Sequence, residues 1–96
     1  MIYNNVILTV KNRQNIDTVR ELLAEQARRS SEEPGCERFE VYQSQADAAL
    51  FMLVEQWTTQ EDLDRHKQAA AFTQLYLPKV IPLVDRVPHP SELVWP

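Results

Sequence analysis

Glycine is almost absent from this chain, because Gly35 is the only one among 96 residues. A dinucleotide-binding fingerprint and a phosphate-binding loop both need several glycines at fixed offsets, so that the backbone can approach the phosphates closely. Neither motif can be assembled from a single glycine. The sequence therefore excludes the common nicotinamide, flavin and nucleotide folds, and we expect no cofactor of these kinds.

Cysteine is equally scarce, since Cys36 is alone. A disulfide is excluded, and Cys36, His66 and His89 lack the spacing of a metal site. We therefore expect the protein to bind no metal. A single thiol and the absence of a leader-like segment are typical of a cytoplasmic protein, which is the location that we expect.

Long apolar runs and an excess of basic residues are also missing. No apolar stretch approaches the length of about 18 residues that indicates a membrane-spanning helix. Ten basic residues stand against 14 acidic ones, and the net charge of −4 disfavours nucleic acid and anionic membrane surfaces. We expect neither a membrane nor a nucleic acid as a partner, and instead a small-molecule substrate.

The hydrophobic pattern divides the chain into strands and helices. The expected elements are a strand over residues 1–10, a helix over 16–31, strands over 36–44 and 50–57, a helix from residue 60, a second helical piece over 71–81 and an extended segment over 84–95. Pro88 and Pro90 confine the last segment to a sheet edge or a crossing arm. This order predicts one α+β domain over residues 1–96, ferredoxin-like (β-α-β-β-α-β), with a four-stranded antiparallel sheet and helices on one face.

The expected architecture leaves one face of the sheet uncovered. A chain of 96 residues builds only a small core, so further burial against a partner is favoured. The simplest cover is a second copy of the chain. We therefore expect a homodimer in which the arm Leu93-Val94-Trp95 reaches the partner.

The stretch over residues 50–72 holds the candidate site. Period-two alternation places Glu55 and Trp57 on one face of the strand, together with Phe51 and Leu53. The following helix carries His66 on its apolar stripe. If this helix folds back onto the strand, Glu55, Trp57 and His66 converge on one partly apolar space.

Two segments, EPGCERFEVYQ at residues 33–43 and FMLVEQWTTQEDLDRHKQAAAF at 51–72, resemble the antibiotic biosynthesis monooxygenase family of dimeric α+β barrels. That family shows an E-P-G-C turn, an aromatic strand, E-x-W, a short acidic helix and H-x-x-x-x-x-F. The matching positions are Glu33 to Cys36, Phe39, Glu55, Trp57, His66 and Phe72. The resemblance covers nearly the whole chain and implies the same dimeric fold. Family members include cofactor-free oxygenases that form quinones, haem-degrading enzymes and an isomerase for a phosphorylated autoinducer dione.

The resemblance to the cofactor-free oxygenases implies specific roles. Such an enzyme deprotonates a phenol, whose anion then reduces dioxygen, and the protein supplies a base and hydrogen-bond donors. His66 suits the base, because its unperturbed pKa is about 6.5. Trp57 offers an N–H donor and a stacking plane, and Asn5, or else Asn4, could orient oxygen atoms together with Tyr76. The substrate would be lined by Glu55, Phe51, Phe72 and Tyr76.

A purely structural interpretation stays open beside these roles, since a tryptophan that ends a strand is usually a core residue. Two departures from the family pattern also narrow the activity. Many members place a second histidine directly before the phenylalanine, whereas this chain has Ala71, which weakens an isomerase or two-histidine mechanism. The axial histidine of the haem-degrading members falls on Tyr76, so a haem ligand is missing.

Three functions remain as hypotheses. The first is a quinone-forming monooxygenase for a small aromatic or polyketide-like compound, which requires an apolar, closed pocket. The second is an isomerase for a small phosphorylated or polar carbonyl compound, which requires Lys67, Arg38 and Arg28 at the pocket. The third is a non-catalytic ligand-binding dimer, in which Phe51, Leu53, Phe72 and Tyr76 would fill the space.

Overall fold

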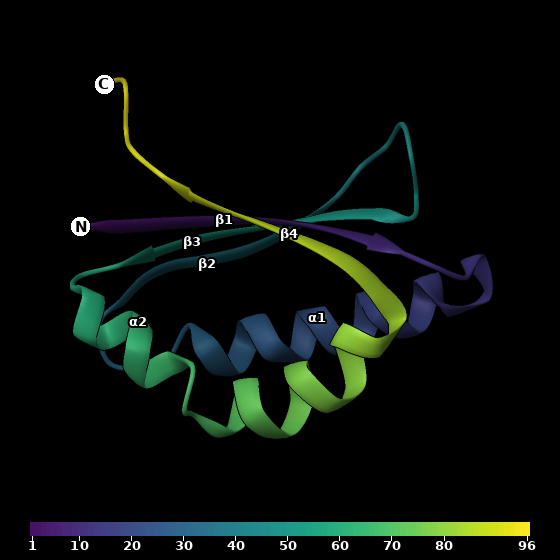
Figure 1. Cartoon of the computed structure of the whole chain (residues 1–96), viewed down its shortest axis with the longest axis horizontal. Coiled ribbons are helices and arrows are strands. Elements are labelled where there is room, and N and C mark those ends of the chain that lie inside the picture. Colours follow the sequence, from purple (N-terminus) through teal and green to yellow (C-terminus); the bar gives the residue numbers. More distant parts are fainter.

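The computed structural model describes all residues from 1 to 96 and has two layers, a sheet and a set of helices (Figure 1). In chain order the elements are β1 (Ile2–Val10), η1 (Arg13–Asn15), α1 (Ile16–Ser30), β2 (Cys36–Gln43), β3 (Leu50–Trp57), α2 (Gln60–His66), η2 (Ala71–Val80), η3 (Ile81–Leu83) and β4 (Val84–Ser91). The helices lie on one side of the sheet in Figure 1. The predicted α+β, ferredoxin-like fold is confirmed.

The sheet has the strand order β2-β3-β1-β4, and every neighbouring pair is antiparallel. β4 is an edge strand, as its prolines predict, because a proline has no N–H to donate to a second neighbour. Regular pairing ends at Ser91, so the extended segment is shorter than the predicted 84–95. The last residues leave the sheet on the side opposite to the helices (Figure 1).

The core lies between the sheet and the helices, and the period-two pattern decides which residues enter it. Every second residue of β1 from Asn4 to Val10 is buried, and so is every second residue of β3 from Phe51 to Trp57. The register places Asn4 opposite Glu55 and Val6 opposite Leu53, so both strands present one continuous face. The helical side contributes the apolar stripe of α1 and, from η2, Tyr76 and Val80.

η2 is a wide π-type helix, as the hydrogen bond from the Ile81 N–H to the Tyr76 carbonyl indicates. Pro78 lies inside it. A proline in a regular α-helix removes a donor and clashes with the carbonyl of the preceding turn. A wider turn is compatible with that ring, and such segments occur often near functional sites. In this chain η2 carries Phe72 and Tyr76, which border the site described below.

Gly35 holds the start of α2 against the start of β2. Its φ of +78° lies in the left-handed region that favours glycine. A Cβ at this position would clash with the Asp62 side chain, which would have to move to make room for it. The Thr59 hydroxyl accepts a hydrogen bond from the Asp62 N–H, which confirms the predicted N-cap of α2. The single glycine therefore fixes the position of the helix that ends in His66.

We expect Gly35→Ala to lower the free energy of unfolding by about 1–3 kcal/mol, because alanine at this φ is strained and its Cβ displaces Asp62. Urea unfolding at fixed protein concentration would measure the change. Glu32→Ala, an exposed position in the same turn, is the control and should leave the midpoint in place. Equal midpoints for Gly35→Ala and wild type would contradict the close approach to Asp62.

Candidate active site

β3 delivers two buried polar groups to the end of the sheet. Glu55 and Trp57 lie on its helix-facing side, and both are buried. The indole Nε1–H of Trp57 donates a hydrogen bond of 3.0 Å to Oε1 of Glu55. Trp57 was expected to offer this N–H to a substrate. In the structure this N–H is already hydrogen-bonded to Glu55.

His66 lies at the end of α2 and is only 3% exposed. Its ring stands over Trp57, with 4.6 Å between the ring centroids and an angle of 33° between the planes. Phe39 and Phe72 pack around it, with ring centroids at 5.7 and 5.5 Å. The fold thus brings Glu55, Trp57 and His66 together, since α2 folds back towards the face of β3 that carries the other two.

Glu33 holds the His66 ring in place. Its Oε1 lies 2.6 Å from His66 Nδ1. A carboxylate at Nδ1 favours the tautomer in which Nδ1 carries the proton, so that Nε2 is the ring nitrogen able to accept one. Nε2 makes no hydrogen bond with another side chain. Glu33 belongs to the E-P-G-C turn, but no local pattern predicts this role, because Glu33 and His66 are 33 positions apart in the chain.

Glu55 is a carboxyl group in an unusual environment. Burial raises its pKa above the ordinary value, because the charged form loses its hydration. Four neighbours act in the opposite direction: the hydrogen bond from Trp57, the charge of His66, the nearby side-chain amide of Asn4 and the charge of Arg86. Burial is the largest of these effects, so the protonated form of Glu55 is favoured relative to an exposed glutamate.

The two neighbouring asparagines point to opposite faces of the sheet. Asn4 is buried on the face that carries Glu55, its partner in the β1–β3 register. Asn5, the predicted site residue, lies on the other face and donates a hydrogen bond of 3.1 Å to the Ser91 hydroxyl. Successive residues of a strand face opposite ways, so Asn4 is the asparagine near the site and Asn5 is not.

A small internal cavity of about 10 Å³ lies among these groups. It is bordered by Asn4, Gln26, Leu53, Glu55, Leu63, His66, Lys67, Phe72, Tyr76 and Arg86. Gln26 comes from α1, is 1% exposed, and its Oε1 has no hydrogen-bond partner. Gln26 was not among the predicted site residues. The available signal was a polar amide three residues after Leu23 and seven after Val19, within an apolar stripe.

A larger opening of about 310 Å³ adjoins this cavity between η2 and β4. Tyr76 and Arg86 border both spaces. The Nε–H of Arg86 donates a hydrogen bond of 2.9 Å to the Tyr76 hydroxyl. Burial raises the pKa of Tyr76 above its ordinary value. Phe72 also borders both spaces, and its ring centroid lies 5.3 Å from that of Tyr76.

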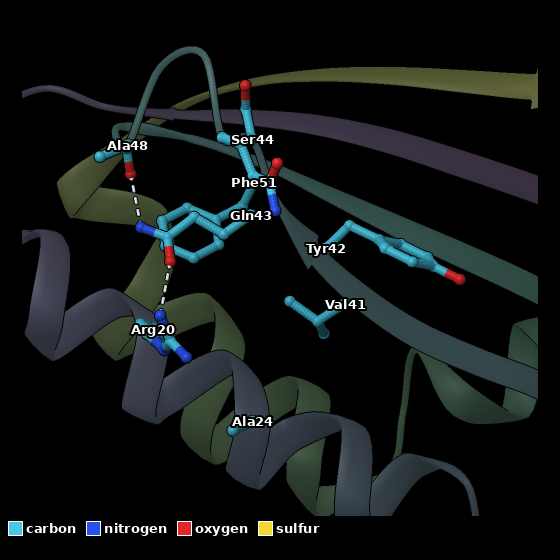
Figure 2. Close-up of a pocket in the computed structure, with 9 residues that line it drawn as sticks. Arg20, Ala24, Val41, Tyr42, Gln43, Ser44, Ala48 and Phe51 are labelled. Atoms are coloured by element: carbon cyan, nitrogen blue, oxygen red, sulfur yellow. Dashed lines mark hydrogen bonds between the residues drawn. The ribbon is translucent and has the colours of Figure 1, made fainter.

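Phe51, another predicted substrate contact, borders a different space. It lies at the far end of β3, in an open groove of about 620 Å³ between α1 and the β2–β3 hairpin (Figure 2). Figure 2 shows Arg20 donating to the Gln43 side chain, which in turn donates to the Ala48 carbonyl. These polar groups satisfy one another, and the groove contains no buried titratable group. Phe51 is thus separate from Glu55, Trp57 and His66.

The basic residues required by the isomerase hypothesis are only partly present. Lys67 borders the cavity and the opening. Arg28 forms an ion pair with Glu25, and Arg38 with Glu40, and neither arginine borders either space. Leu53, Phe72 and Tyr76 pack where the third hypothesis expects them, but the cavity also contains buried polar groups that a simple apolar core would not need.

Three further findings concern membrane-spanning helices, metal sites and the single cysteine. No helix has both the length and the apolar content to span a membrane. No cluster of three or more histidine, cysteine, aspartate or glutamate side chains could hold a metal ion. Burial raises the pKa of the Cys36 thiol to about 11, so the only cysteine is a poor nucleophile at neutral pH.

Several solved structures share this fold. A conserved protein of unknown function from Bacteroides thetaiotaomicron is 28% identical over 96% of both chains, with a TM-score of 0.88. A protein from Nitrosomonas europaea is 22% identical over 97% of this chain and 99% of its own, with a TM-score of 0.85. It is described as an antibiotic biosynthesis monooxygenase. SnoaB, a cofactor-independent oxygenase from Streptomyces nogalater, is 13% identical and covers 99% and 94%, with a TM-score of 0.85.

No curated protein matches the chain in sequence. The family comparison is positive: residues 1–76 match the family described as antibiotic biosynthesis monooxygenase. This match includes β1, the E-P-G-C turn, the E-x-W strand end and α2, which together build the site. The chain therefore belongs to the antibiotic biosynthesis monooxygenase family.

Proposed function

We propose that this protein is a cofactor-independent monooxygenase of the quinone-forming type, acting on a small aromatic or polyketide-like compound. The main supporting observation is the Glu33–His66 pair, which holds a buried imidazole beside Trp57 and Glu55 in a member of this family. The similarity in fold to SnoaB, a cofactor-independent oxygenase, agrees with the proposal.

In the proposed reaction His66 Nε2 takes the proton of a phenolic hydroxyl, while Nδ1 donates to Glu33. The electron-rich phenolate then transfers electrons to dioxygen. One oxygen atom becomes the new carbonyl of the quinone, and the other leaves as water with two protons from the substrate. All four electrons that reduce dioxygen come from the substrate, so no other reductant is required.

The other groups assist at the oxygen atoms. Burial raises the pKa of the Glu55 carboxyl, so this group is easier to protonate than an exposed glutamate, and in its protonated form it can donate a hydrogen bond or a proton to a reduced oxygen species. Asn4 and Tyr76 are further donors beside the cavity. A cavity of about 10 Å³ has room for about one water molecule and not for an aromatic ring. The substrate must therefore enter from the opening and displace Phe72, which borders both spaces.

Oxygen uptake tests the proposed reaction. Purified protein, incubated with a panel of naphthols and anthrones, should consume one dioxygen per quinone formed, and with ¹⁸O₂ the label should enter the new carbonyl. Added flavin, nicotinamide and metal should be unnecessary, and a chelator should have no effect. A quinone whose new oxygen comes from water, or a rate equal to that without protein, would refute the proposal.

An isomerase for a small polar carbonyl compound is the second candidate, because Lys67 stands beside the opening. It would convert its substrate without consuming oxygen, which distinguishes the two activities in the same assay. A non-catalytic ligand-binding module is the third, and the small size of the cavity favours it. It predicts binding of the panel compounds with no turnover.

We further propose a single-domain, cytoplasmic protein that forms a homodimer through the uncovered face of the sheet. That face carries apolar side chains that the helices do not cover: Ile7, Met52, Val54 and Val87. Beyond β4, Val94 and Trp95 are 89% and 85% exposed, which is typical of residues that pack on another chain. These features support an arm that reaches a second copy.

We expect sedimentation at micromolar concentration to give twice the mass of the 11.2 kDa chain. Val87→Glu places a charge on the uncovered face of the sheet, beside Ile7, and should shift the mass towards that of one chain. Leu77→Glu, an exposed apolar position on η2, is the matched control and should leave the dimer intact. A wild-type protein that sediments as a single chain would contradict the homodimer.

A further inference from the structure

The opening between η2 and β4 is the way into the site. It is lined by Lys67, Phe72, Tyr76, Leu77, Ile81 and Arg86. Four of these residues also border the internal cavity beside His66 and Glu55. The volume of about 310 Å³ is at the lower end of the range for small-molecule sites, which suits one or two fused rings.

Two cations at this opening form no ion pair with a carboxylate of the protein. The four ion pairs of the structure involve Arg28, Arg38, Arg65 and His66, so Lys67 and Arg86 take part in none. The chain as a whole is acidic, with a net charge of −4. Because the chain is acidic overall, a generally basic surface does not explain why two cations without an ion pair lie at the same opening.

Arg86 is held in a fixed orientation by the fold. In the β1–β4 register it stands opposite the buried Leu8, so its side chain lies on the helix-facing side of the sheet. Its Nε–H donates to the Tyr76 hydroxyl, and its guanidinium carbon lies 6.0 Å from the centre of the Tyr76 ring. Its terminal nitrogens make no hydrogen bond and can bind a carboxylate with two parallel N–H donors.

The remaining lining of the opening is aromatic and aliphatic. Phe72 and Tyr76 lie side by side, and Leu77 is 45% exposed on the rim although it is apolar. Such a wall suits the flat body of an aromatic compound. Inside, burial raises the pKa of Glu55, so its carboxyl ionises less readily than that of an exposed glutamate.

We propose that the compound bound at this site is a planar aromatic carboxylate, whose anionic group is bound by Lys67 and Arg86 at the opening and whose ring lies against Phe72 and Tyr76. This inference rests on the proposed function for the location of the site, and it adds the class of substrate. It identifies the two cations as the residues that distinguish a carboxylate from a neutral phenol of the same size.

Calorimetric titration with two probes of equal ring size, 2-naphthoate and the neutral 2-naphthol, tests the inference at pH 7. We expect 2-naphthoate to bind about tenfold more tightly than 2-naphthol, and added salt to weaken only the carboxylate. Lys67→Gln and Arg86→Gln should each lower the affinity for 2-naphthoate by about threefold to tenfold and change that for 2-naphthol little. Lys79→Gln, an exposed lysine of η2 outside the opening, should change neither.

Equal affinity for the two probes, no binding of either, or an equal loss in Lys79→Gln would overturn the inference. Lys67 lies on the surface after α2, so its replacement keeps the test valid even if Arg86→Gln folds poorly. The readout is binding and does not need turnover. Charge-dependent binding of 2-naphthoate, together with no oxygen uptake from the panel of naphthols and anthrones, would support the class of ligand and count against the monooxygenase. Oxidation of those phenols without charge-dependent binding would do the reverse.

Discussion

Replacement of His66 by alanine is expected to lower the turnover of an accepted phenolic substrate by about 10²–10⁴-fold, the usual effect of losing a general base. The expectation follows from an imidazole whose Nδ1 is held by Glu33 and whose Nε2 is free. Stopped-flow or oxygen-electrode kinetics would measure kcat and KM separately, and the loss should appear in kcat. His89→Ala changes the only other histidine of the chain, on the edge strand, and should leave turnover unchanged.

Stability must be measured beside activity, because His66 packs between aromatic rings. Its truncation to alanine opens a cavity and is expected to cost about 2–4 kcal/mol of unfolding free energy. His66→Gln keeps more of the volume and a possible hydrogen bond to Glu33, but it cannot act as a base near neutral pH. If His66→Gln is well folded and retains wild-type kcat, His66 is not the base.

The partner of His66 provides a second, sharper comparison. Glu33→Ala leaves the imidazole free to choose either tautomer, so part of the activity should remain. Glu33→Gln can donate its amide N–H to Nδ1, which moves the ring proton to Nε2 and removes the acceptor from the site. We therefore expect the glutamine variant to be less active than the alanine variant. The opposite order would show that Glu33 has only a structural role.

Replacement of Glu55 by glutamine is expected to change the pH dependence of stability. The folded-state pKa of Glu55 is raised by burial, so the folded protein holds this proton to a higher pH than the unfolded chain does. The contribution of Glu55 to the free energy of unfolding is fully present below the pKa of the unfolded chain, about 4.3. It is lost as the pH rises through the pKa of the folded protein. The loss amounts to about 1.4 kcal/mol for each unit between the two pKa values.

Glu55→Gln should therefore remove this decrease in stability, which in the wild-type protein sets in as the pH rises above about 4.3. The amide oxygen can still accept the hydrogen bond from Trp57. Urea unfolding as a function of pH would show the difference between the two proteins, with Glu32→Gln, an exposed glutamate, as the control. Trp57→Phe should have the opposite effect to Glu55→Gln, since it removes a hydrogen bond that lowers the pKa of Glu55. Parallel pH profiles for Glu55→Gln and wild type would contradict the raised pKa.

The fold and half of the site could be predicted because they depend on local patterns. Alternation along β3 determines that Glu55 and Trp57 share the buried face, and the cap at Thr59 determines where α2 begins. Residues three or four positions apart share one face of a helix, so His66 lies beside Leu63 on the buried side of α2. These relations act over fewer than ten residues, so the amino-acid order alone is sufficient to state them.

The first strand shows the limit of such patterns. Alternation states that Asn4 and Asn5 face opposite sides, but it does not state which side the helices cover. Choosing Asn5 in place of Asn4 shifts the prediction by one position, and a shift of one position moves the side chain to the other face of the sheet. The pairing of Asn4 with Glu55 across β1 and β3 resolved it. Phe51 is a similar case, since it shares a face with Glu55 but lies at the other end of the strand, beside the groove.

By itself the sequence determined the order of elements, the buried faces and the family of this protein, because hydrophobic periodicity, capping and turn residues act between near neighbours. Only the tertiary structure decided which groups meet. Glu33 reaches His66, Gln26 of α1 faces the cavity, and Arg86 of β4 binds the Tyr76 hydroxyl because packing of the helices on the sheet brings distant segments within hydrogen-bond distance. The tertiary structure also decided that the Trp57 N–H donates to Glu55, because a buried donor bonds to the nearest acceptor once water is excluded.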